Sequence, residues 1–80
     1  MYYVYILKGA KGSRHYIGST ENINERISQH NKGRVRSTKA YRPWKIVYTE
    51  NHETKTSARK REIFLKRTAK AREEIFSQLK

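Results

Sequence analysis

The 80-residue sequence contains no cysteine, a single proline and only seven acidic residues. Without cysteine the chain can form neither a disulfide framework nor a thiolate zinc site, and this composition suits a reducing compartment. The three histidines do not fall at the spacing of metal ligands. Eighty residues support one small core and are too few for two. We therefore expect a single domain that spans residues 1–80.

Long apolar runs are also missing. No stretch reaches the roughly 20 residues that a membrane-spanning helix needs. The apolar opening MYYVYIL has neither the preceding basic residues nor the following cleavage site of a secretory signal. We expect a cytoplasmic protein with no membrane partner.

Positive charge is what the sequence has in excess. Nineteen Lys and Arg residues against seven Asp and Glu residues give a net charge of +12 at pH 7. Such a surface favours a polyanionic partner, and nucleic acid is the commonest one. The alternatives are a protein that is basic without such a partner, or one that lies on anionic lipid.

Two short strands are predicted at the start of the chain. In residues 2–7, Tyr3 and Tyr5 belong to one face and Val4 and Ile6 to the other. Both faces are apolar, as expected of a central strand that is covered on both sides. Two glycines in KGAKGSR predict a turn into a second strand at about 14–18, which makes a hairpin.

A helix is predicted next. Asn22 offers an N-cap with Glu25 three residues later, and Gly33 is a C-terminal stop. Residues at i, i+4 and i+7 form its inward face: Ile23, Ile27 and His30.

Residues 32–42 are basic and lack periodicity, which predicts an irregular loop. Pro43 follows at a position that the start of a strand tolerates. The third strand is predicted from an alternation of Trp44, Ile46 and Tyr48.

The rest of the chain is predicted to be helical. A long helix begins near Thr54 or Thr56 and runs past Leu65, a break falls near 68–69, and a C-terminal helix covers about 70–80. One stripe of the long helix should face inward and consists of Ala58, Glu62, Leu65 and Ala69.

Tyr5 and Tyr16 lie on the two strands that are predicted to pair. Strand tyrosines usually serve only to fill the faces of a sheet, and a phenol is a poor base at neutral pH unless neighbours stabilise its phenolate. Arg26 borders the inward face of the next helix and is a candidate for that role and for holding a phosphate, the alternative being a solvated arginine. His30, one turn later, is a candidate to donate to a phosphate or relay a proton, or else interacts with the carbonyls at the helix end.

Glu62 is the only acidic residue between Lys55 and Arg72. It either pairs along the helix with Arg59 or Lys66, or it recruits a divalent cation to a basic surface. Mg²⁺ suits a lone carboxylate because it takes one or two of them and keeps several waters.

The remaining basic residues suit contacts with a nucleic-acid backbone, which bind phosphates without reading sequence. Solvated charge is the alternative. The residues predicted to make these contacts are Lys32, Arg34, Arg36, Lys39, Arg42 and Arg59.

Together these segments resemble the GIY-YIG nuclease superfamily. YVY at residues 3–5 stands where the first motif belongs, without its leading glycine, and YIG at residues 16–18 matches the second motif as written. NERISQHN resembles the helix that follows, and ARKREIFLK resembles the later helix with the acidic residue. The resemblance covers about residues 2–68, which we take as the domain core. The spacing closely resembles that of small stand-alone bacterial members, most of them of unassigned function.

The resemblance implies an α+β fold, in which helices flank a small three-stranded antiparallel sheet in the order β-β-α-β-α-α. It also implies metal-dependent cleavage of a DNA phosphodiester bond. Tyr5 would activate or position the attacking water, Tyr16 would support that water or contact the phosphate, and Arg26 would stabilise the transition state. His30 would assist, and Glu62 would bind a single divalent cation, Mg²⁺ or Mn²⁺.

Two departures from the family pattern have consequences. Some members use an asparagine after the acidic helix, but no asparagine follows Asn51 here. Accessory domains commonly choose the DNA site in this family, and we expect none within these 80 residues. We therefore expect either weak activity without defined specificity or a protein partner that supplies the specificity. We also expect a monomer.

The leading hypothesis is a metal-dependent DNA endonuclease in repair or recombination, with RNA left open as a substrate. One alternative is a non-catalytic nucleic-acid-binding module with the same fold. Another is an adaptor that docks on a repair or RNA-processing protein.

Overall fold

The computed structural model describes residues 1–10 and 14–79. One antiparallel sheet has the strand order β2-β1-β3. The predicted α+β class, the three-stranded sheet and the order β-β-α-β-α-α are confirmed. The elements are β1 (Tyr2–Gly9), β2 (His15–Thr20), α1 (Ile23–Asn31), a short 3₁₀ helix η1 (Lys39–Tyr41), β3 (Trp44–His52), α2 (Lys55–Arg67) and α3 (Ala69–Gln78).

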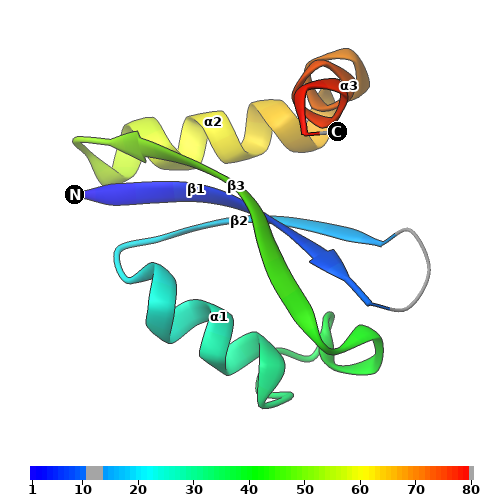
Figure 1. The fold of residues 1–80 in the computed structure, drawn as a ribbon. Helices are drawn as coiled ribbons and strands as arrows, with labels where there is room; N and C mark the ends of the chain where they lie inside the picture. Colours follow the sequence, from blue (N-terminus) through cyan, green and yellow to red (C-terminus); the bar gives the residue numbers. More distant parts are fainter. Residues whose placement is uncertain (11–13, 80) are drawn as a thin grey trace.

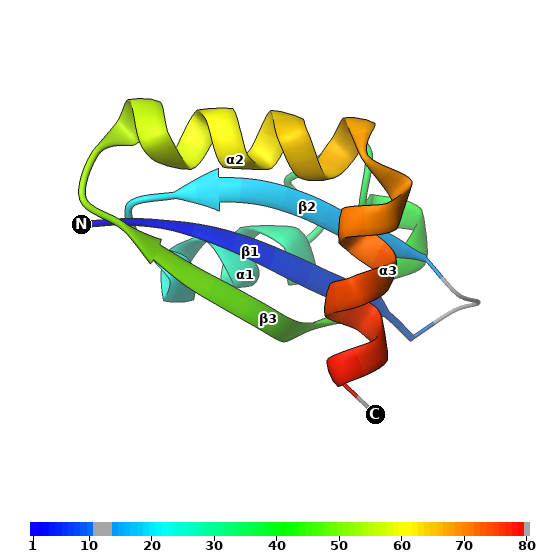
Figure 2. The same cartoon turned by 90° about the horizontal axis from the view of Figure 1, so that it is seen from above.

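The sheet is covered on both faces. Figure 1 shows α1 on one side of it and α2 with α3 on the other, and Figure 2 shows α2 running along β2 while α3 crosses the strands. The central strand β1 supplies both cores. Its Val4 and Ile6 pack into the core on the α2 and α3 side, and its Tyr5 and Leu7 pack into the second core beside α1. The predicted alternation of β1 is therefore confirmed.

The edge strand β3 departs from the simple alternation predicted for it. Ile6 pairs with Tyr48 but Leu7 pairs with Ile46, so Val47 is an extra residue in the ladder. Such a bulge resets which side chains face which way. Tyr48 consequently packs with the core on the α2 side, whereas Trp44 and Ile46 belong to the core beside α1.

The other edge strand, β2, pairs with β1 as a hairpin would require. Lys8 lies opposite His15 and Tyr5 lies opposite Gly18. Strand β2 begins and ends one or two residues later than predicted. Residues 11–13 of the predicted turn lie outside the described residues.

The first helix begins and ends where the sequence predicts. The Asn22 side chain accepts a hydrogen bond from the Glu25 amide at 3.1 Å, and Gly33 takes a φ of +77° after the last turn. The prediction of an irregular loop over 32–42 is wrong in one respect, because η1 forms there. Its anchor is the indole of Trp44, which donates to the Thr38 carbonyl at 2.8 Å.

The second and third helices meet at the predicted break. Thr68 is extended there, and Nη1 of Arg72 donates to the carbonyls of Leu65 and Lys66 at 2.8 and 2.7 Å. These bonds satisfy carbonyls that the end of a helix would leave without partners. Ala69, predicted to face inward with the α2 stripe, is instead exposed and begins α3.

The C-terminal helix ends at Gln78 rather than near 80, and residue 80 lies outside the described part of the chain. Across residues 1–10 and 14–79, none of the helices is both long and apolar enough to span a bilayer.

Candidate active site

The Tyr5 hydroxyl is the centre of a hydrogen-bonded cluster. Tyr5 is 2% exposed, on the central strand, and its ring points toward α1. Its hydroxyl lies 3.1 Å from Nε2 of His30 and 3.2 Å from Nε of Arg26. Arg26 and His30 are one helical turn apart, so α1 presents both to the same oxygen, as their spacing predicts.

Tyr16 completes the aromatic wall of this cluster. Its ring centroid lies 6.2 Å from that of Tyr5 and 4.7 Å from that of His30, edge-on to the imidazole. Between the two tyrosines is Gly18, which lies opposite Tyr5 in the ladder. A Cβ at Gly18 would stand 2.6 Å from the Tyr5 hydroxyl oxygen and 3.1 Å from the Tyr16 ring.

His30 is fully buried and neutral. Its Nδ1 lies 2.8 Å from the hydroxyl of Thr38, which is itself only 1% exposed. Both ring nitrogens therefore bond to side chains rather than to the carbonyls at the helix end. Burial, helped by the positive charge of Arg26, lowers the pKa of His30 to about 4.

The Tyr5 phenol keeps its proton at neutral pH in this state. Burial raises the pKa of Tyr5 to about 12, although the hydrogen bond from Arg26 acts in the opposite direction. The same bond to Tyr5 raises the pKa of the Arg26 guanidinium above its ordinary value. Tyr5 is thus a hydrogen-bonded phenol that faces a neutral imidazole and a permanent cation.

Glu62 approaches the cluster from the other face of the sheet. It is 4% exposed, on α2, and accepts from the Ser19 hydroxyl at 2.6 Å and from Nζ of Lys66 at 2.7 Å. Nη1 of Arg59 lies 3.2 Å from both carboxylate oxygens. Both helix pairings considered for Glu62 are therefore present.

The carboxylate and the phenols lie on opposite faces of the edge strand β2. Ser19, which holds Glu62, is next in the chain to Gly18, over which the Tyr5 hydroxyl lies. The Lys66 ammonium, bonded to Glu62, also lies 5.9 Å from the centre of the Tyr16 ring. All five predicted catalytic residues are thus brought to one region that straddles this strand.

Glu62 also suits a divalent cation chemically. Burial alone would raise the pKa of Glu62, but hydrogen bonds from Lys66 and Ser19 and the charge of Arg59 outweigh it and hold the pKa below its ordinary value. The group is therefore an anionic oxygen donor of the kind that Mg²⁺ prefers. Among the residues that the structure describes, no three His, Cys, Asp or Glu side chains gather as a ligand set. A cation at Glu62 would take its other ligands from water and phosphate.

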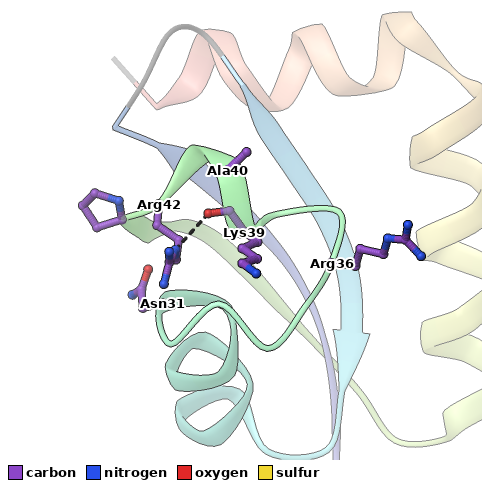
Figure 3. Close-up of a pocket in the computed structure, with 6 residues that line it drawn as sticks. Asn31, Arg36, Lys39, Ala40 and Arg42 are labelled. Carbon is purple, nitrogen blue, oxygen red and sulfur yellow. Dashed lines mark hydrogen bonds between the residues drawn. The ribbon is translucent and has the colours of Figure 1, made fainter.

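The residues predicted to contact the nucleic-acid backbone lie in separate regions of the structure. An open pocket of about 540 Å³ is lined by residues that include Arg36, Lys39 and Arg42. Figure 3 shows Lys39, Arg42 and Asn31 near one another, while the Arg36 side chain points away from them. Nε of Arg42 donates to the Lys39 carbonyl at 2.9 Å, which fixes the guanidinium.

The other predicted contacts lie outside this pocket. Lys32 caps the end of α1 and Arg34 is exposed just beyond it. Arg59 is on α2 and pairs with Glu62, so it belongs to the carboxylate region.

Sequence reasoning missed three residues of the cluster: Gly18, Ser19 and Thr38. Gly18 carried a signal, since a glycine inside a strand often marks a close approach of another group. The sequence gives no such signal for Thr38, because a single threonine in a basic segment without periodicity has no pattern that predicts burial.

The fold and the cluster define the class of this protein. A small antiparallel sheet with a tyrosine on each of two paired strands, an arginine and histidine on the next helix, and a glutamate on a later helix is the arrangement of a GIY-YIG domain. Residues 1–74 match the family model described as the GIY-YIG catalytic domain. The chain belongs to this family.

The similar proteins are small as well. UPF0213 proteins of Staphylococcus aureus strains COL and USA300 are each 42% identical to this chain over 66 residues, which is 81% of this chain and 79% of the relative. The solution NMR structure of a UPF0213 protein from Bacillus halodurans matches with a TM-score of 0.57 and 32% identity, over all of this chain and 86% of the other.

Proposed function

We propose that this protein is a metal-dependent DNA endonuclease that hydrolyses phosphodiester bonds in DNA repair or recombination. One observation carries the proposal. The Tyr5 hydroxyl lies within hydrogen-bonding distance of a base that is neutral at pH 7, His30, and of a cation, Arg26.

A tyrosine with such neighbours can accept a proton from water while it passes its own to the imidazole. The water O–H bond breaks as a new O–H bond forms at Tyr5, and the Tyr5 proton moves to Nε2 of His30. The hydroxide attacks phosphorus, and the bond to the leaving oxygen breaks with its electron pair on that oxygen. Arg26 holds the Tyr5 oxygen by its hydrogen bond and stabilises the negative charge that develops on the phosphate, because its guanidinium remains charged throughout.

The other residues bind and orient the DNA. Tyr16 borders the space next to Tyr5 and contacts the phosphate there. Glu62 would hold a divalent cation, Mg²⁺ or Mn²⁺, which supplies further positive charge for the phosphate oxygens. Lys39 and Arg42 bind backbone phosphates away from the cut bond, because phosphate contacts position a strand without reading it.

The test is cleavage of nicked, branched and flapped DNA by purified protein with Mg²⁺ or Mn²⁺. Tyr5→Phe removes only the hydroxyl and should lower the cleavage rate about 100-fold or more. Tyr3→Phe is the matched control, since Tyr3 is on the same strand and the same face, and it should cut as wild type does. Failure of wild type to cut any substrate, or equal rates for Tyr5→Phe, contradicts the proposal.

A non-catalytic nucleic-acid-binding module is the second candidate, and one observation favours it. Both Glu62 oxygens already accept from Lys66 or Arg59, which neutralises the carboxylate without a metal. This alternative expects DNA binding that is indifferent to Mg²⁺ and to Glu62→Gln. The endonuclease expects Mn²⁺ to broaden NMR signals near Glu62 in wild type and not in the variant.

A further inference from the structure

Thr38 is an exception within its segment. Its neighbours Arg36, Ser37 and Lys39 are exposed, whereas Thr38 is 1% exposed. Its carbonyl accepts from the Trp44 indole at 2.8 Å, and its hydroxyl reaches His30 at 2.8 Å. The basic segment is therefore fixed at the residue that contacts the histidine of the active site.

The directions of the hydrogen bonds around His30 follow from its neighbours. A threonine hydroxyl has one proton, and Thr38 donates it to the Val35 carbonyl at 3.3 Å. In that arrangement the Thr38 oxygen accepts from His30, which places the imidazole proton on Nδ1. A neutral imidazole has only one such proton, which leaves a lone pair on Nε2 toward Tyr5.

The Tyr5 hydroxyl fits this assignment. Arg26 has no acceptor and can only donate to Tyr5. The Tyr5 proton is therefore directed to Nε2 of His30. With the opposite tautomer, both Arg26 and His30 would donate to the Tyr5 hydroxyl, and the Tyr5 proton would need another acceptor.

We propose that Thr38 is a positioning residue whose hydroxyl holds His30 in the tautomer protonated on Nδ1, so that Nε2 can accept the proton of Tyr5. The role of this tautomer in catalysis rests on the proposed endonuclease, because the proton moves to His30 only when Tyr5 takes one from water. With the opposite tautomer, Nε2 already has a proton and the transfer stops.

NMR of the imidazole nitrogens tests the tautomer without DNA. In ¹⁵N-labelled wild type at pH 7, His30 should show a protonated Nδ1 and an unprotonated Nε2, with signals assigned by their loss in His30→Gln. Thr38→Ser should keep this pattern, and Thr38→Val should shift His30 toward the Nε2-protonated tautomer. An unprotonated Nδ1 in wild type, or an unchanged tautomer in Thr38→Val, overturns the proposal.

Cleavage tests the consequence. Thr38→Val should lower the single-turnover cleavage rate about 100-fold with DNA affinity unchanged, because binding does not use the tautomer. Thr38→Ser should restore cutting to within about threefold, and Ser37→Ala, an exposed neighbour, should cut as wild type does. Equal losses in Thr38→Ser and Thr38→Val would show that the methyl group and not the hydroxyl matters, which overturns the proposal.

The two arms separate this proposal from the proposed function. If wild type cuts no DNA, the endonuclease is refuted while NMR still decides the tautomer. If Thr38→Val fails to fold, the wild-type tautomer and the Thr38→Ser variant still decide it.

Discussion

The Tyr5 hydroxyl lies against the backbone of Gly18, and a Cβ on Gly18 would stand 2.6 Å from its oxygen. No real Cβ tolerates such an approach, so the position of the phenol depends on the absence of a side chain on the neighbouring strand. The YIG motif therefore supplies two things to the site: the Tyr16 side chain and, at Gly18, the space that the Tyr5 hydroxyl occupies.

Gly18→Ala should displace Tyr5 from Arg26 and His30. We expect a loss of about 1–3 kcal/mol in the free energy of unfolding, typical of an overpacked core, and loss of DNA cleavage. Urea denaturation measures the first and single-turnover cleavage the second. Because Cζ of the Tyr5 ring would stand only 2.7 Å from the same Cβ, the stability penalty should persist in a Tyr5→Phe background. A penalty that disappears there would show that the hydroxyl alone is the obstacle.

The stability of the fold should depend on pH through His30. Burial and the charge of Arg26 lower its pKa from 6.5 to about 4, so between these values the unfolded chain binds more protons than the folded one. The free energy of unfolding should be constant just above pH 6.5 and fall by about 1–3 kcal/mol as pH decreases from 6.5 to 4. Urea denaturation at several pH values measures it.

The variant His30→Gln is the control for this window, because it cannot titrate. Its stability curve should be flatter than that of wild type between pH 6.5 and 4. Glu50 and Glu62, whose pKa values are lowered from the ordinary 4.5, also reduce stability as pH falls through that value, but they do so in both proteins and cancel in the comparison. Parallel curves for the two proteins would assign the pH dependence to other groups.

Removing the charge of Glu62 should separate cutting from binding. Glu62→Gln should abolish Mg²⁺-dependent cleavage, as EDTA should in wild type, while DNA affinity without metal stays equal or rises because a negative charge is lost. Cleavage and fluorescence anisotropy measure the two effects.

Glu50→Gln is the matched control for that experiment. Glu50 is on the opposite edge strand, where it accepts from Arg61 at 2.8 Å and from the Tyr48 hydroxyl at 2.6 Å. Its loss should lower stability and leave the metal dependence of cleavage unchanged. If both variants lose cleavage in proportion to their stability, Glu62 has only a structural role.

The basic pocket should contribute to the salt dependence of DNA binding. Replacing Lys39 and Arg42 together with Ala should reduce the slope of log K against log salt by about 2, near 0.9 for each lost phosphate contact. The charge-matched control replaces Lys55 and Lys70, which are exposed on α2 and α3, on the other side of the sheet. Equal reductions in both double variants would show that only total charge matters.

Sequence patterns with a local cause predicted the fold well. The alternation of β1 predicted which residues enter each core, and Asn22 and Gly33 predicted the ends of α1, because strand pleat and capping depend on neighbours in the chain. The bulge at Val47 could not be predicted, since it results from how β3 pairs with a strand about 40 residues earlier.

The candidate site was predictable only in part, for the same reason. The position of Arg26 beside His30 follows from helix geometry, and the inward stripe of α2 indicated the burial of Glu62. The bonds from Ser19 to Glu62 and from Thr38 to His30 join residues that no periodicity relates. These hydrogen bonds can be identified only from the folded arrangement of the sheet and the basic segment.

The place of Tyr5 on the central strand has a consequence for how this family could change over time. The ring fills a core and the hydroxyl serves the site, so the two can be lost separately. A descendant that gave up cutting DNA would still need an aromatic ring at position 5 to keep its core filled, and phenylalanine would meet that need. Such a protein would keep nearly every other structural feature of the nuclease. The missing Tyr5 hydroxyl oxygen would then be the clearest sign that DNA cleavage had been lost.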